Sequence, residues 1–209
     1  MDRTRMILGV LLVVSLPPAV LFWLLIHPFA RFWRGIGPRR TYMTSGALFV
    51  LLGIALFRLR TTIMGPDLGT NWALFFVGCI LYLISARISV LTRRQLDNRT
   101  FAGVPEISPE ESKGVLLQEG IYKVVRHPRY LAVVIGIAGF TMVVNYLGLY
   151  LLYLGSMAAL LLVVIFEERE LEDRFGREYT EYRSRVPALL PRIGSKARDA
   201  SLHPKPPTT

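Results

Sequence analysis

The chain has 209 residues, 52% of which are hydrophobic, and its mean hydropathy is +0.41. A soluble domain of this size would divide its apolar residues into short periodic segments. Here long apolar blocks alternate with basic stretches, as they do in multi-pass membrane proteins. The formal net charge of +10 follows from those basic stretches. We therefore expect a lipid bilayer, and not a nucleic acid, as the partner of the positive charge.

The chain offers few side chains for metal ligation or disulfide formation. Its single cysteine, Cys79, lies inside an apolar block, and its three histidines, His27, His127 and His203, are far apart in sequence. One cysteine cannot form an internal disulfide, and such widely separated histidines lack the spacing of zinc ligands. The sequence therefore predicts no metal centre.

Three apolar blocks in the first half of the chain are candidate membrane spans: residues 6–30, 42–57 and 72–91. About 20 helical residues cross the ~30 Å hydrocarbon core, and fewer suffice where flanking side chains extend to the headgroups. We interpret the first block as a retained span, because it is longer than the apolar region of a signal peptide and lacks a cleavage site of small residues.

A further apolar stretch, residues 131–166, is too long for one span. Asn145 and Gly148 favour a turn near its middle, so it predicts a hairpin of two helices. Small residues such as Gly136, Gly139 and Gly155 would let those two helices pack closely. The predicted fold is an all-α integral membrane protein with about five transmembrane helices, the last two forming the hairpin.

The 25 Lys and Arg residues are unevenly distributed between the predicted loops. With five spans, residues 31–40, the loop at 92–129 and the tail after Phe166 share one side of the membrane, and most of the basic residues lie there. The positive-inside rule then places the C-terminus in the cytoplasm and the N-terminus outside. We expect a multi-pass protein of the cytoplasmic membrane, or of an inner membrane or endomembrane.

The apolar residues after the fifth span recur at helical spacing and predict a cytoplasmic amphipathic helix that packs on the hairpin. They are Leu171, Phe175, Tyr179, Tyr182 and Val186. The predicted organisation is therefore three N-terminal spans in residues 1–91, then a loop, the hairpin and this helix in residues 92–193. We expect the polar, proline-rich tail at 194–209 to be disordered.

Charged residues flank both ends of the predicted hairpin. Arg126 and His127 precede the fourth span, and Glu167 and Glu168 follow the fifth, so the hairpin brings all four to the same membrane face. A pocket among them would suit a zwitterionic or cationic ligand and a lipid-soluble partner. The residues alone leave a second interpretation open, in which they only anchor the helices at the headgroups or pair with neighbouring arginines.

Two ordered motifs surround the hairpin: G-x-Y-x-x-x-R-H-P-x-Y at residues 120–130 and E-E-x-x-L-x-x-x-F-G-x-x-Y-x-x-Y-x-x-x-V-P-x-x-x-P at residues 167–191. At this spacing they resemble the isoprenylcysteine carboxyl methyltransferase family. Its members are membrane methyltransferases that use S-adenosylmethionine and are related to the phospholipid N-methyltransferases. The resemblance covers about residues 114–191. It implies methyl transfer from S-adenosylmethionine to a lipophilic acceptor.

The resemblance also implies roles for individual residues. Glu168 matches the acid that holds the charged end of the cofactor, Arg126 braces the R-H-P motif, and Glu167 is the other candidate catalytic acid. The residues that match cofactor-contacting positions of the family, besides Glu168, are Val115, Leu116, Leu117, Tyr122, His127, Pro128, Arg129 and Tyr130.

The sequence does not determine the identity of the methyl acceptor. Eukaryotic members of the family have an arginine a few residues before the acidic pair, where it meets the substrate carboxylate, but here residues 162–166 are all apolar. The acceptor could therefore be like an isoprenylcysteine carboxylate or be another small or lipid molecule. A carboxylate acceptor is already ionised and needs no base, whereas a thiol or amine must lose a proton, for which Glu167 and His127 are candidates.

Two other functions remain possible at this point. Membrane sterol and steroid reductases share an R-H-P-x-Y motif but use NADPH, and they typically have an asparagine and an acid where this chain has Arg129 and Ala132. A non-catalytic membrane module would bind neither cofactor. Binding of S-adenosylhomocysteine or of NADPH would separate the three.

Overall fold

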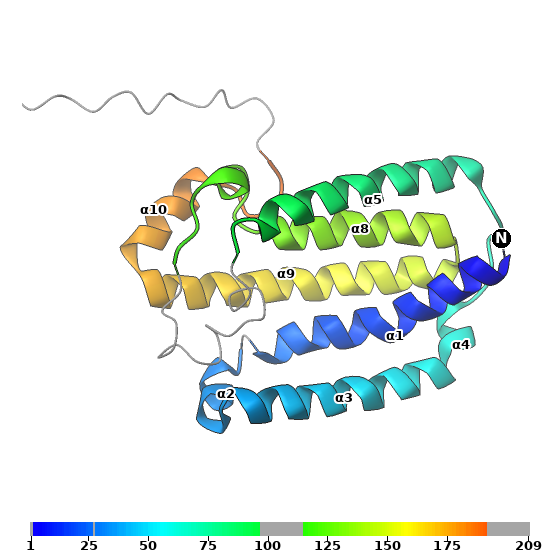
Figure 1. Cartoon of the computed structure of the whole chain (residues 1–209), viewed down its shortest axis with the longest axis horizontal. Helices are drawn as coiled ribbons and strands as arrows, with labels where there is room; N and C mark the ends of the chain where they lie inside the picture. Colours follow the sequence, from blue (N-terminus) through cyan, green and yellow to red (C-terminus); the bar gives the residue numbers. More distant parts are fainter. Residues whose placement is uncertain (1, 27, 97–114, 192–209) are drawn as a thin grey trace, which may run out of the picture.

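The computed structural model describes residues 2–26, 28–96 and 115–191. In this part of the chain the regular secondary structure is helical, with one isolated bridge between Asp67 and Tyr146, and the long helices run side by side (Figure 1). The predicted disordered tail lies outside the described residues, as do residues 97–114 of the predicted loop at 92–129.

Four helices are long and apolar enough to cross a membrane: Arg3–Ile26, Arg39–Arg58, Trp72–Arg93 and Leu147–Phe175. They belong to α1 (Asp2–Ile26), α3 (Pro38–Arg58), α5 (Trp72–Arg93) and α9 (Leu147–Phe175). The length and apolar composition of these helices identify the chain as a multi-pass membrane protein. The remaining predicted span corresponds to α8 (Pro128–Val144), which is apolar but only 17 residues long, about 25 Å. Short helices α2 (Ala30–Ile36) and α4 (Arg60–Met64) flank α3.

The predicted hairpin of α8 and α9 is confirmed, and its turn is at Asn145. This residue has φ 57°, the left-handed conformation that ends many helices, and its side chain bonds to Gly69 O at 2.9 Å and accepts from Tyr150 at 2.9 Å. Gly148 is not part of the turn. It lies where α9 approaches the backbone of Ile63 so closely that no side chain would fit.

The expectation that small residues join α8 to α9 is wrong for Gly136 and Gly139. Both face α5, where a Cβ on Gly139 would lie 2.5 Å from Gly78 O, and Ser85 donates to Ala132 O at 2.7 Å. Because glycines permit backbone contact between apolar helices, α8 and α5 pack along their lengths. The third span therefore fixes the position of the helix that begins with the R-H-P motif.

Helix α9 extends well beyond Phe166. Its 29 residues measure about 43 Å, more than the ~30 Å hydrocarbon core, so its last turns project past the apolar layer. Gly176, with φ 54°, ends α9, and the chain reverses into α10 (Arg177–Arg185), at the left end of Figure 1. The predicted stretch from Leu171 to Val186 is thus two helices and not one.

The two helices still converge on one apolar cluster. Tyr179, Tyr182 and Val186 are buried, and Leu171, Phe175 and Leu116 pack against them. The partners of this face are the end of α9 and the segment before the 3-10 helix η1 (Gly120–Lys123), so the packing is local to this end of the bundle.

At the opposite end of the bundle, an arginine in α1 forms hydrogen bonds and an ion pair with neighbouring segments. Arg5 is only 3% exposed and donates to Val144 O at 3.0 Å and to Thr70 Oγ1 at 3.0 Å, and it pairs with Asp67. A cation at the C-terminal carbonyls of α8 is favourable, since that end of a helix carries partial negative charge. Arg5 thereby ties α1 to the hairpin turn and to the loop before α5.

Candidate functional site

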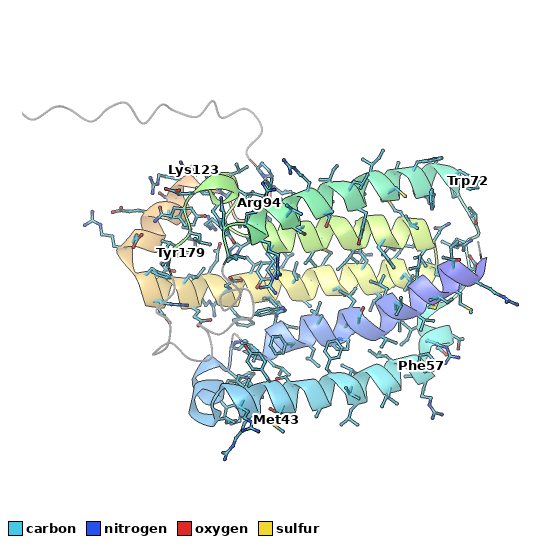
Figure 2. The ribbon with its side chains drawn as sticks, viewed as in Figure 1. Met43, Phe57, Trp72, Arg94, Lys123 and Tyr179 are labelled. Carbon is cyan, nitrogen blue, oxygen red and sulfur yellow. The ribbon has the colours of Figure 1, made fainter. Side chains whose placement is uncertain are left out.

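A pocket lies where α9 meets α10 and η1. Figure 2 labels Arg94, Lys123 and Tyr179 around this end of the bundle. The wall is mixed, with aliphatic, aromatic and charged side chains. It consists of Leu96, Val115, Leu116, Leu117, Tyr122, Arg126, His127, Glu167, Leu171, Arg174, Phe175, Tyr179 and Tyr182.

Arg126 connects three segments at the base of the pocket. Its Nε donates to Glu168 Oε1 at 3.0 Å, its Nη2 pairs with the same carboxylate, and its Nη1 donates to the carbonyl oxygens of Arg183, at 2.9 Å, and Val186. The side chain is 8% exposed. A buried guanidinium has to be neutralised and hydrogen-bonded in this way, so Arg126 fixes α10 relative to α9.

The backbone continues the same connection. The N–H groups of Arg126 and His127 donate to Pro187 O at 2.9 Å and Ala188 O at 3.0 Å. Residues 126–127 and 187–188 therefore lie side by side. Pro128, the first residue of α8, has no N–H group and therefore starts the helix without needing an acceptor.

His127 lies between the two glutamates. Its Nε2 is 3.2 Å from Glu168 Oε1, its Nδ1 is 3.8 Å from Glu167 Oε2, and its side chain is 3% exposed. The Glu168 carboxylate thus orients the imidazole ring, and the other ring nitrogen faces Glu167. A histidine in this position can exchange a proton with Glu167 or stabilise its negative charge.

The two adjacent acids have different surroundings. Glu168 is occupied by Arg126 and His127, and Arg183 Nε lies 3.5 Å from its second oxygen; it is not part of the pocket wall. Glu167 lines the pocket, and its Oε2 is buried without a hydrogen-bond partner among the described residues. Buried carboxylate oxygens are normally satisfied, so Glu167 is the acid that can receive a ligand.

Seven of the residues expected from the sequence line the pocket, and four do not. Glu168, Pro128, Arg129 and Tyr130 lie outside its wall. The Arg129 guanidinium is 4.6 Å from the ring of Trp23 in α1, and Tyr130 is buried against the hairpin interior. The seven in the wall are Val115, Leu116, Leu117, Tyr122, Arg126, His127 and Glu167.

Sequence reasoning missed the contribution of the C-terminal aromatic face to the pocket. Phe175, Tyr179 and Tyr182 were expected to pack on the hairpin, but all three border the pocket, and the Tyr182 hydroxyl donates to Tyr122 O at 2.7 Å. Arg174, one of the arginines that follow the acidic pair, also lines the wall. The signal that could have found them is the regular spacing of aromatic residues directly after the acidic pair.

The tyrosines around the pocket stay protonated at neutral pH. Burial raises the pKa of Tyr122, and the negative charge of Glu167 raises it further. Burial likewise raises the pKa of Tyr179, and that of Tyr182 to about 12. These hydroxyls can donate hydrogen bonds and present aromatic faces, but they do not act as bases.

The fold and the site together define a helical membrane protein with a mixed polar and aromatic pocket at one end of its bundle. The model of the phospholipid methyltransferase family matches residues 73–178, and the chain belongs to this family. The matched residues include nearly all of α5, the hairpin and the whole pocket wall apart from Tyr179 and Tyr182. No solved structure matches the chain.

Two kinds of named relative are similar to it. Methanethiol S-methyltransferase 2 of Bradyrhizobium diazoefficiens is 32% identical over 190 residues, covering 85% of this chain and 71% of the relative. A probable protein-S-isoprenylcysteine O-methyltransferase of Oryza sativa subsp. indica is 30% identical, covering 66% and 72%. Protein-S-isoprenylcysteine O-methyltransferase B of Arabidopsis thaliana is 26% identical, covering 69% and 73%. The chain is a membrane methyltransferase, and not the reductase or the non-catalytic module that the sequence alone left open.

Proposed function

We propose that the methyl donor is S-adenosylmethionine and that it binds in the pocket between α9, α10 and η1. The observation that carries this proposal is the buried oxygen of Glu167, which has no hydrogen-bond partner within the described part of the chain, in a pocket with aromatic walls. S-adenosylmethionine carries an ammonium and a sulfonium, and a carboxylate in a partly desolvated site attracts such charges. Tyr122, Phe175 and Tyr179 offer ring surface on which an adenine can pack.

In this proposal the two glutamates have different roles. Glu167 contacts the donor, whereas Glu168 acts as a positioning residue, because Arg126 and His127 already occupy it. The role that the family resemblance gives to Glu168 thus moves to its neighbour. Arg126 keeps α10 against the pocket through the carbonyls of Arg183 and Val186. Val115, Leu116 and Leu117 supply the wall on the other side.

When bound, the donor supplies an electrophilic methyl group, and catalysis consists mainly of aligning the acceptor with it and excluding water. We infer that the acceptor is a small or lipophilic thiol. The segment before the acidic pair, residues 162–166, is apolar and carries no cation for a substrate carboxylate. A thiol must lose its proton as sulfur attacks, and the adjacent Glu167 and His127 can take it.

An isoprenylcysteine carboxylate is the second candidate acceptor. It is favoured by the names of the relatives from Oryza sativa and Arabidopsis thaliana. A carboxylate, with an ordinary pKa of about 4, needs no base. Loss of activity on removal of the base, measured at saturating donor, is therefore expected for a thiol acceptor only.

The distribution of charge supports a cytoplasmic position for the pocket. Arg126, Arg174, Arg177, Arg183 and Arg185 gather at the end of the bundle that holds α10. By the positive-inside rule this end faces the cytoplasm, and the end fastened by Arg5 faces outward. S-adenosylmethionine would then reach the pocket from the cytoplasm and the acceptor from the bilayer.

Calorimetric titration of the purified protein with S-adenosylhomocysteine and with NADPH tests the donor. We expect saturable binding of S-adenosylhomocysteine alone, and binding of NADPH alone would overturn the proposal. Incubation with S-[methyl-³H]adenosylmethionine and either methanethiol or an S-farnesylated cysteine then tests the acceptor. Label on the farnesylcysteine only would replace the thiol by the carboxylate.

A further inference from the structure

A second hollow lies on another face of α1, away from the methyl-donor pocket. It is a groove of about 470 Å³ between α1 and α3, closed at one end by α2. Figure 1 shows α1 and α3 running side by side toward α2, at the same end of the long axis as α10. The lining is almost wholly apolar. It consists of Pro18, Leu21, Phe22, Leu25, Trp33, Thr44, Ser45, Leu48, Phe49 and Leu52.

Both ends of the groove are defined by contacts. A Cβ on Gly53 would lie 3.4 Å from Val14 Cγ1, so α1 and α3 meet there and the groove stops. At the other end, Trp33 is held by a hydrogen bond from its Nε1 to Leu25 O at 2.9 Å. The sides are open to the surroundings of the bundle, since Leu48 is 44% and Phe49 is 39% exposed.

The groove has the length of an acyl chain in one leaflet. From Thr44 to Leu52, α3 rises about 12 Å, and half of the ~30 Å hydrocarbon core is about 15 Å. The polar edge of the bilayer is marked by α2, where Phe29 and Phe32 are 55% and 59% exposed, as expected for residues inserted at the interface. The groove therefore spans a single leaflet on the side of the donor pocket.

A positive charge lies directly beyond the mouth of the groove. Residues four apart in a helix share a face, so Arg40 continues the row of Thr44, Leu48 and Leu52 by one turn toward α2. Arg40 is exposed, and the Thr44 hydroxyl donates to the Arg40 carbonyl at 2.6 Å. An apolar channel under an arginine is complementary to a lipid whose headgroup is anionic.

We propose that this groove is a binding site for an anionic phospholipid, with one acyl chain between α1 and α3 and the headgroup phosphate at Arg40. The site is separate from the chemistry. Phe22 lines the groove, but the adjacent Trp23 faces Arg129 and the hairpin interior on another side of α1. The proposal therefore stands whether or not the assignment of donor and acceptor is correct.

The neighbouring arginine provides a matched control. Arg39 lies at the same end of α3, on the same helix face as Met43 and Leu51. Those two residues are each 66% exposed and do not line the groove. Figure 2 labels Met43 on the side of α3 that faces away from α1. Arg39→Gln and Arg40→Gln thus remove the same charge at the same depth, and only Arg40 stands over the groove.

Native mass spectrometry of the full chain, released from membranes of mixed phosphatidylglycerol and phosphatidylcholine, tests the site. We expect wild type and Arg39→Gln to retain phosphatidylglycerol, and Arg40→Gln to retain about fivefold less, the factor that corresponds to ~1 kcal/mol for one arginine near an anionic headgroup. Equal retention by the two variants, or equal retention of the two lipids by wild type, would overturn the proposal.

A second pair of variants tests the chain-binding part. Leu48→Trp fills the groove, whereas Leu51→Trp adds the same volume on the outward row. We expect less bound lipid for Leu48→Trp only, with an unchanged midpoint of thermal unfolding as the check of folding. Lipid retention that is the same in both tryptophan variants would show that the groove does not hold the chain. If Leu48→Trp does not fold, the arginine pair decides the outcome.

Discussion

Arg126 and Glu168 form a buried ion pair across the base of the pocket, with the guanidinium Nε 3.0 Å from the carboxylate, although 42 residues separate them in the chain. The hairpin of α8 and α9 is what brings them together. Glu168 is engaged in this ion pair. The preceding residue, Glu167, is therefore the acid that faces the pocket. The assignment of roles in this enzyme follows from that difference.

Glu167→Gln should weaken the binding of S-adenosylhomocysteine by about 10- to 100-fold, because it removes a charge-assisted contact that contributes ~1.5–3 kcal/mol. The fold should not suffer, since the affected oxygen has no hydrogen-bond partner among the described residues. Calorimetry and thermal unfolding measure the two effects. Asp173→Asn, an exposed acid farther along α9, is the control and should bind normally. Undiminished affinity in Glu167→Gln would remove Glu167 from the site.

Glu168→Gln should instead destabilise the folded protein. Removal of one partner of a buried ion pair typically costs about 3–5 kcal/mol, since the other charge remains buried without compensation. Chemical unfolding in detergent measures the loss. The double variant Arg126→Met, Glu168→Leu should recover part of the stability without recovering methyl transfer. A stable Glu168→Gln protein that has lost only its donor affinity would show that Glu168, and not Glu167, holds the donor.

Gly139→Val should disturb the packing of α8 on α5. A Cβ at this position would lie 2.5 Å from Gly78 O, so the helices must separate, and overpacking of this kind costs about 1–3 kcal/mol. Methyl transfer should fall with it, because α8 begins with the R-H-P motif. Gly155→Ala has no atom within 4 Å of the new Cβ and should be neutral or slightly stabilising. Thermal unfolding of both variants is the comparison, and equal midpoints would contradict the role of the glycine contact.

Arg5→Gln should destabilise the end of the bundle that holds the hairpin turn by about 1.5–3 kcal/mol, the contribution of hydrogen bonds to a charged group. It removes the bonds to Val144 O and Thr70 and the ion pair with Asp67. Arg3, an exposed residue of the same helix, provides the control variant Arg3→Gln. Hydrogen exchange of the turn around Asn145 should rise for Arg5→Gln only. Unchanged protection there would show that the turn is held without Arg5.

The amino-acid sequence by itself determined the class of the protein and most of its elements. Long apolar blocks predict membrane helices whatever their partners are, because the bilayer imposes the length. The hairpin was predicted from its length and from Asn145, and the pocket face from the charges at both ends of the hairpin. The family resemblance rests on two motifs at a fixed spacing, and both motifs can be read directly in the sequence.

Only the tertiary structure decided what each charged residue does. Glu167 and Glu168 are adjacent in sequence and chemically identical, and their difference arises because successive residues of a helix point 100° apart, one toward Arg126 and the other toward the pocket. For the same reason, the sequence could not show that Gly139 faces α5 and that Arg5 reaches the hairpin turn. Contacts between segments far apart in the chain depend on how whole helices are rotated against each other, and a local pattern does not contain that rotation.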